Sequence, residues 1–96
     1  MNENEYQGLL IKKIKKLFPG CLVFKNDTSY MQGIPDLTVI VGGRWALLEV
    51  KAYEGAPEQP NQPYYVEKAN GMSFGAFIYP ENEREVLDAL QQALCQ

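Results

Sequence analysis

With 96 residues the chain fits a single domain, spanning residues 1–96, and such a domain buries only roughly 60 to 65% of the surface that its unfolded chain exposes. A dimer interface is therefore a natural supplement to so small a core. The chain contains no histidine, which excludes a Ser-His-Asp triad, a histidine-based nuclease pair and a histidine-ligated zinc site. The apolar runs are too short to span a bilayer and the first residues lack the apolar core of a signal peptide, so we expect a cytoplasmic protein that makes no membrane contact.

The formal net charge of −3 is distributed unevenly along the chain. Residues 1–53 contain seven Lys or Arg and five Asp or Glu, a charge of +2, whereas residues 54–96 contain two and seven, a charge of −5. A local basic patch can attract the phosphates of DNA even when the whole chain is acidic. The candidate DNA-binding residues are Lys12, Lys13, Lys16 and Lys25, with Lys15 beside them. The alternative is that these lysines only form a solvated helix face.

Residues 3–18 have the spacing of an amphipathic helix that ends at Pro19-Gly20. At about 100° per residue, its apolar side chains fall within one arc and its lysines lie outside that arc. Glu3 falls inside the apolar arc, whereas Glu5 falls on the opposite face. Glu3 is therefore directed toward the body of the protein, unless this end of the helix overhangs the core.

Hydrophobic patterning and Gly/Pro punctuation predict six further elements. The predicted strands cover residues 21–25, 37–41, 45–50 and 75–79, and the predicted helices cover residues 62–70 and 82–94. Gly42-Gly43 separates two of the strands and can adopt the positive φ angles of a tight two-residue hairpin turn. The resulting order, αβββαβα, predicts an α/β fold with a central mixed β-sheet flanked by helices.

The hairpin predicts a cluster of charged side chains. If Gly42 and Gly43 are the central turn residues, the numbers of opposed residues sum to 85 and Asp36 lies opposite Glu49. Opposed residues have Cβ atoms about 4.5 to 5.5 Å apart, close enough for two carboxylates to share one divalent ion. Strand alternation then places Lys51 on the same face as Glu49. A turn that is one residue longer or shifted would separate the pair.

Two acids and an amine on one patch suit phosphodiester hydrolysis. Carboxylates so close together repel each other, and a bound Mg²⁺ or Mn²⁺ relieves that repulsion. Such an ion polarises the scissile phosphate and lowers the pKa of a bound water. The ammonium of Lys51 can orient that water or offset charge in the transition state. Each element alone has an ordinary alternative, because Glu-x-Lys also occurs in surface strands and Pro-Asp often starts a strand or helix.

The segment Gly33-Ile-Pro-Asp36, followed by a hydrophobic strand and Glu49-Val-Lys51, resembles the PD-(D/E)-x-K nuclease superfamily. More narrowly, it resembles the virus-type replication-repair nuclease (VRR-NUC) domain in its short, stand-alone, phage-like form. The resemblance covers nearly the whole chain and includes Glu3 followed by Gln7, and Gln62 after the lysine. It implies a restriction-endonuclease-like core that acts in a bacterial host cell or is encoded by a phage.

The resemblance also implies roles for individual residues. Asp36, Glu49 and the backbone carbonyl of Val50 are implied to hold the metal, and Lys51 to serve the water. Glu3 and Gln62 are implied to complete the catalytic site. Glu5 is a rival for the role of Glu3, and Gln59 is a rival for the role of Gln62.

The leading hypothesis is thus a divalent-metal-dependent DNA endonuclease that acts as a homodimer on branched or Holliday-junction-like DNA. An alternative is a catalytically idle nuclease fold that only binds DNA or a protein partner. Restriction-type cleavage of ordinary duplex DNA is disfavoured, because 96 residues leave little room for a module that reads bases. RNA as the substrate stays open.

Overall fold

Three helices and four strands alternate in the order αβββαβα within residues 1–95, the part of the chain that the computed structural model describes. The helices are α1 (Glu3–Leu17), α2 (Gln62–Met72) and α3 (Glu83–Leu94), and the strands are β1 (Leu22–Lys25), β2 (Leu37–Val41), β3 (Arg44–Val50) and β4 (Gly75–Ile78). The predicted α/β class is confirmed, and every predicted element is present with ends that shift by at most two residues. The largest shift is in α2, which continues past Asn70 because the Ser73 N–H still donates to the Ala69 carbonyl.

The four strands form one mixed sheet in the order β1-β2-β3-β4. The first two neighbour pairs are antiparallel, and β3 pairs with β4 in parallel. Val41 pairs with Arg44 across the turn, so the predicted register of the hairpin is confirmed. Of the two turn glycines only Gly42 has a positive φ, 59°, which is the pattern of a type II′ turn.

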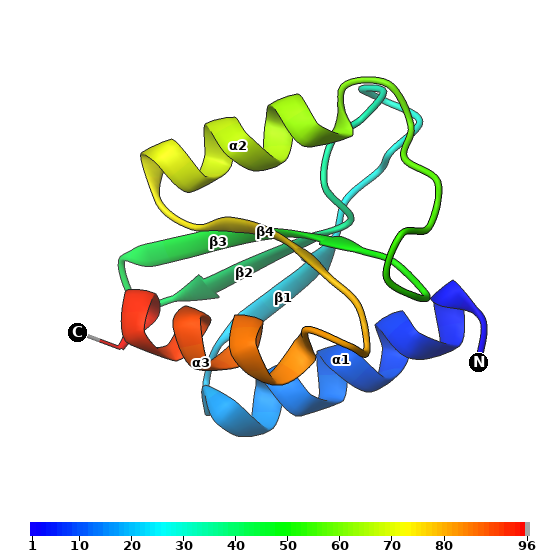
Figure 1. Cartoon of the computed structure of the whole chain (residues 1–96). Helices are drawn as coiled ribbons and strands as arrows, with labels where there is room; N and C mark the ends of the chain where they lie inside the picture. Colours follow the sequence, from blue (N-terminus) through cyan, green and yellow to red (C-terminus); the bar gives the residue numbers. More distant parts are fainter. Residues whose placement is uncertain (96) are drawn as a thin grey trace.

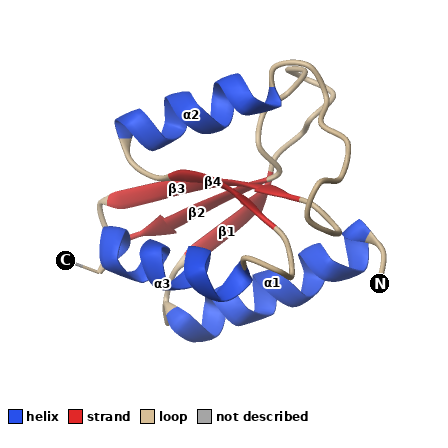
Figure 2. Ribbon diagram, in the orientation of Figure 1, coloured by secondary structure: helices blue, strands red, loops and turns tan. Residues whose placement is uncertain are grey.

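Helices cover both faces of this sheet (Figure 1 and Figure 2). On one face, α1 and α3 lie against the sheet and enclose the hydrophobic core, to which β3 contributes Ala46, Leu48 and Val50. On the other face, α2 packs against β3 and β4. Gly75 permits this close approach, because a Cβ at that position would lie 2.4 Å from the Val66 carbonyl oxygen. No helix in the described residues is long and apolar enough to cross a membrane.

Strand alternation directs Glu49 and Lys51 away from the hydrophobic core, onto the face that α2 covers. Both side chains are nevertheless buried, because the start of α2 and the loop before it lie over them. The sheet therefore has one apolar face and one face with a polar, enclosed end. The candidate site forms at that polar end.

Candidate active site

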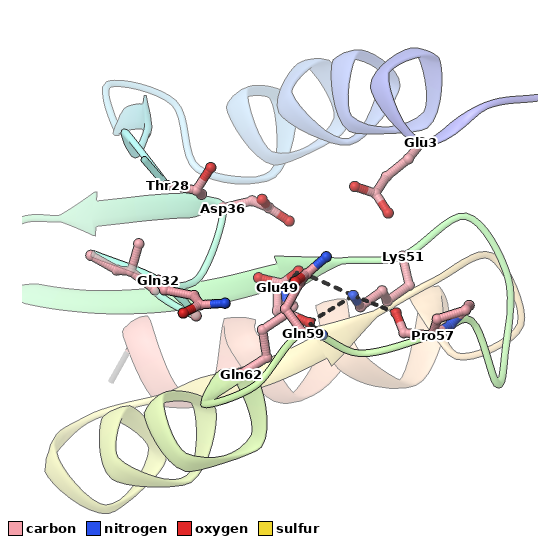
Figure 3. A pocket seen from close by; sticks show the side chains of 11 residues that line it. Glu3, Thr28, Gln32, Asp36, Glu49, Lys51, Pro57, Gln59 and Gln62 are labelled. Atoms are coloured by element: carbon pink, nitrogen blue, oxygen red, sulfur yellow. Dashed lines mark hydrogen bonds and ion pairs between the residues drawn. The ribbon is translucent and has the colours of Figure 1, made fainter. Parts of the chain in front are cut away.

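A cavity of about 370 Å³ opens at the end of the sheet where β2 begins and β3 ends. We call it the acidic cavity, after the three carboxylate side chains that line it. Its charged and amide-bearing lining residues are Glu3, Gln32, Asp36, Glu49, Lys51, Gln59 and Gln62. Figure 3 shows that these side chains come from α1, from the loops before β2 and α2, from the end of β3 and the residue after it, and from the start of α2. All five residues that the sequence suggested as catalytic thus lie around one cavity.

Asp36 is held beside Glu49 by the hairpin. It directly precedes β2, and continuing the observed register from the Leu37–Leu48 pair places it opposite Glu49. Its Oδ2 accepts a hydrogen bond of 2.9 Å from the backbone N–H of Val50. The Val50 backbone therefore orients the Asp36 carboxylate, in addition to carrying the carbonyl that the resemblance implies as a metal ligand.

Asn26 fixes the segment that carries Asp36. Its side-chain amide donates to the Pro35 carbonyl at 2.8 Å and accepts from the Thr38 hydroxyl at 2.9 Å, and its backbone N–H donates to the Asp36 carbonyl at 2.8 Å. These bonds tie the end of β1 to the start of β2. The sequence predicted no structural contact for Asn26, so this positioning role was missed.

Gln62 connects Glu49 and Lys51 in a buried hydrogen-bond network. Its Nε2 donates to Glu49 Oε2 at 2.8 Å, and its Oε1 accepts from Lys51 Nζ at 2.8 Å and from the Gln59 backbone N–H at 2.7 Å. Lys51 Nζ also donates to the Pro57 carbonyl at 3.0 Å and lies 3.6 Å from Glu49 Oε2. The Lys51 ammonium is thereby held on the edge of the cavity beside the Glu49 carboxylate (Figure 3).

This network separates Gln62 from its rival. Gln62 contributes its side chain to the charged residues, whereas Gln59 contributes a backbone N–H to Gln62 and also lines the cavity. Both glutamines therefore line the acidic cavity, but they make different contacts. The sequence pattern alone does not distinguish Gln59 from Gln62. The two residues are three positions apart, and the pattern does not show which side chain turns toward Lys51.

Among the carboxyl groups of the acidic cavity, that of Glu49 has the pKa shifted furthest from its ordinary value. Burial raises its pKa to about 8, and the negative charges of Asp36 and then Glu3 act in the same direction, while Lys51 opposes them. Its Oε1 is buried and, among the described side chains, is the one buried oxygen or nitrogen without a hydrogen-bond partner. A buried carboxylate oxygen without a partner is unfavourable, and a proton or a cation at that oxygen relieves it.

Glu3 reaches the same cavity from the first turn of α1, whereas Glu5 does not line it. The pKa of Glu3 is raised, first by partial burial and then by the negative charge of Asp36. Glu5 instead closes a capping box with Asn2, in which each residue bonds the other's backbone N–H. The structure thus places Glu3 at the cavity and gives Glu5 a helix-capping contact.

The residues of the acidic cavity fit a hard divalent cation. Carboxylates, amides and backbone groups offer oxygen ligands, which Mg²⁺ and Mn²⁺ prefer. Within residues 1–95, no three Asp, Glu, Cys or His side chains come close enough together to hold an ion by themselves. An ion at Asp36 and Glu49 therefore needs additional oxygen ligands, as is usual for Mg²⁺, which keeps several waters.

The candidate DNA-binding lysines are divided between two places. Lys25 ends β1 opposite Leu37, next to Asp36, and is exposed. Lys12, Lys13 and Lys16 lie in the second half of α1, away from the end that carries Glu3. Lys13 also forms a 2.6 Å ion pair with Glu83 of α3. Of these four lysines, Lys25 alone lies on a strand end beside Asp36, but its pairing with Leu37 puts its side chain on the opposite face of the sheet, and it does not line the acidic cavity.

Comparison of the chain with protein-family models, curated proteins and solved structures found no significant match. We therefore infer function from the residues of the acidic cavity and their chemistry. Beyond the residues that the sequence suggested as catalytic, the cavity is lined by Thr28, Gln32 and Pro57, and by Gly33 and Ile34 of the motif that ends at Asp36. The sequence could not place these loop residues at the cavity, because loop conformation depends on contacts with distant residues.

Proposed function

We propose that this protein is a divalent-metal-dependent endodeoxyribonuclease of the PD-(D/E)-x-K type with a restriction-endonuclease-like core. The observation that carries the proposal is the partnerless, buried Oε1 of Glu49, beside Asp36 and within reach of Lys51. Two acids held together against their mutual repulsion, with an ammonium at the same edge, match the requirements of phosphodiester hydrolysis.

In this proposal Asp36 and Glu49, with the Val50 carbonyl, would hold Mg²⁺ or Mn²⁺, and the bound ion would polarise the scissile phosphate and lower the pKa of a bound water. Two N–H groups of the Lys51 ammonium donate to Pro57 and Gln62, and we assign the third the role of orienting the water and offsetting charge that develops on the phosphate. Gln62 holds the Lys51 ammonium in place through its Oε1. The reaction adds water across one P–O bond and leaves a phosphate monoester and a free hydroxyl.

Glu3 completes the proposed site from α1. Its carboxylate faces the cavity and interacts electrostatically with Asp36 and Lys51. Because three Asp or Glu side chains do not converge on one point, we assign Glu3 an interaction with the ion's water shell. In that position its carboxylate would accept a hydrogen bond from a water and help to set the water's orientation.

We further propose that the chain acts as a homodimer on branched DNA. The support for a dimer is an open part of the sheet face that α2 partly covers. Leu22 and Phe24 of β1 lie on that face and are 55% and 47% exposed. Two copies that bury these side chains against each other would bury more apolar surface than the small core of one chain does. A dimer would also bring together two active sites, as paired strand cuts require. Sedimentation tests the proposal: wild type should be dimeric and Phe24→Ser monomeric.

Cleavage of a four-way DNA junction with Mg²⁺ tests the catalytic proposal. Wild type should cleave, and Asp36→Asn and Lys51→Ala should each lose activity by at least roughly 100-fold, because each removes a group that acts in the transition state. Asp88→Asn and Arg84→Ala, exposed changes on α3, are the matched controls. Activity that survives both site changes would rule out this site.

Calorimetric titration with Mn²⁺ distinguishes the catalytic proposal from an idle DNA- or protein-binding fold. Wild type should bind the ion with measurable heat, and Glu49→Gln should bind it far more weakly, because the amide lacks the charge. A wild-type protein without any heat that depends on Glu49 would favour the idle fold.

A further inference from the structure

A second cavity, of about 200 Å³, lies next to the acidic cavity and shares Lys51 with it. Three aromatic side chains line it, from Tyr53 in the loop after β3 and from Phe77 and Tyr79 at the end of β4. We call it the tyrosine pocket. No step of the proposed hydrolysis uses these aromatic residues.

The sheet register explains why the two cavities are adjacent. Glu49 pairs with Phe77 across the parallel strands β3 and β4, so the two side chains lie on the same face. One step further along, the Lys51 N–H donates to the Ile78 carbonyl, which brings Tyr79 alongside Lys51. Neighbouring strands lie about 4.8 Å apart. The aromatic row of β4 is therefore one strand away from the row of Glu49 and Lys51.

The lining indicates the chemistry of the occupant. The aromatic rings offer flat apolar surfaces, and Glu58 is the acidic residue of the lining. The ammonium of Lys51 is already bonded to Pro57 and Gln62, and among the described residues no other Lys or Arg lines the pocket. A phosphate or another anion is disfavoured beside Glu58. The pocket suits an uncharged, planar group that can donate a hydrogen bond.

We propose that the tyrosine pocket binds an unpaired nucleobase next to the scissile phosphate, an inference that rests on the proposed nuclease function. A phosphate in the acidic cavity is joined through a single sugar to its base, and the tyrosine pocket borders that cavity at their shared residue, Lys51. Aromatic side chains stack on any base, and a base inside a duplex has both faces already stacked. The substrate strand is thus unpaired at the cut, as in a flap, a single strand or the branch point of a junction.

The carboxylate of Glu58 predicts which bases the tyrosine pocket prefers. An ionised carboxylate only accepts hydrogen bonds, and cytosine and adenine carry amino groups that donate, whereas the edge of thymine carries a carbonyl in the same place. The tyrosine pocket therefore prefers an amino-bearing base over thymine.

Binding of a fluorescent single-stranded oligodeoxycytidine in Ca²⁺, measured by anisotropy, tests the pocket without cleavage. Tyr53→Ala should weaken binding roughly 5- to 150-fold, the range expected for the loss of one base–aromatic stack. Tyr53→Phe keeps the ring and should bind like wild type. The control is Tyr64→Ala on α2, since Tyr64 is 57% exposed and Tyr53 is 52% exposed.

A second arm uses Mg²⁺ and a junction or flap with one abasic site moved along the cut strand. An abasic site at the position next to the cut should slow cleavage by wild type. It should not slow cleavage by Tyr53→Ala any further, because this variant already cleaves slowly. Equal binding by wild type and Tyr53→Ala, or no binding by wild type, would overturn the pocket's role even if cleavage is normal. Wild-type binding that depends on Tyr53 without any cleavage would instead contradict the proposed nuclease and leave base binding in place.

Discussion

On one face of β3, Ala46, Leu48 and Val50 are fully buried in the hydrophobic core, whereas on the other face Glu49 and Lys51 are buried against the start of α2. The first face contributes to stability, since each Å² of apolar surface removed from water contributes about 25 cal/mol. The second face buries charged groups, whose desolvation can exceed the gain from pairing them. One strand thus supplies buried apolar side chains on one face and, at its end, the charged side chains of the acidic cavity on the other.

The largest expected effect on stability comes from the apolar face. Leu48→Ala should lower the free energy of unfolding by about 2 to 5 kcal/mol, because it removes packed methyl groups and leaves a cavity. Urea unfolding measures the change. Leu9→Ala, at a leucine that is 40% exposed, should cost far less. A similar cost at both leucines would mean that the core does not lie under α1 and α3.

On the polar face, stability without metal should depend on pH through Glu49. The pKa of this acid is raised to about 8 from 4.5, so the folded state binds the proton more tightly than the unfolded state. Its contribution is fully present below about pH 4.5 and is lost as the pH rises through about 8. The melting temperature in EDTA should therefore fall between pH 5 and pH 9.

The matched variant for this pH effect is Glu49→Gln, which should have a flatter pH profile because the amide does not titrate. Addition of Mg²⁺ at pH 8 should raise the melting temperature of wild type and leave that of the variant unchanged. A wild-type profile as flat as that of Glu49→Gln would show that Glu49 titrates normally.

A smaller effect is expected where the loop before β2 meets the start of α2. Gly33 has a φ of 88°, and a Cβ there would lie 2.7 Å from the Pro60 carbonyl oxygen. Gly33→Ala should cost about 1 to 3 kcal/mol and, by moving Asp36 relative to Gln62, reduce cleavage more than the stability loss accounts for. Gly43→Ala, with an ordinary φ and no atom within 4 Å, should leave both stability and cleavage near wild type.

The smallest expected effect is on DNA binding by the lysines that lie outside the acidic cavity. Lys25→Ala should weaken DNA binding and reduce the slope of log affinity against log salt by about 1, as expected for one lost phosphate contact. Lys13→Ala should change the slope less, because Lys13 is paired with Glu83. Equal slopes for wild type and Lys25→Ala would remove Lys25 from the DNA interface.

Local patterns in the sequence are sufficient to predict the elements of the fold and the central pair of the candidate site. Helix and strand periods are local, and the Gly42-Gly43 turn alone sets which residues of β2 and β3 are opposed. For that reason the approach of Asp36 to Glu49, with Lys51 on the same face, could be predicted before any tertiary contact was known.

The residues that surround that pair are set by packing between elements distant in the chain. The placement of Glu3 rather than Glu5 depends on how α1 lies on the sheet, and the contact of Gln62 with Lys51 depends on the loop that precedes α2. The tyrosine pocket depends on the parallel pairing of β3 with β4, which are separated in the chain by a whole helix. These contacts join residues far apart in sequence, and their free energy comes from packing and burial that no local pattern encodes.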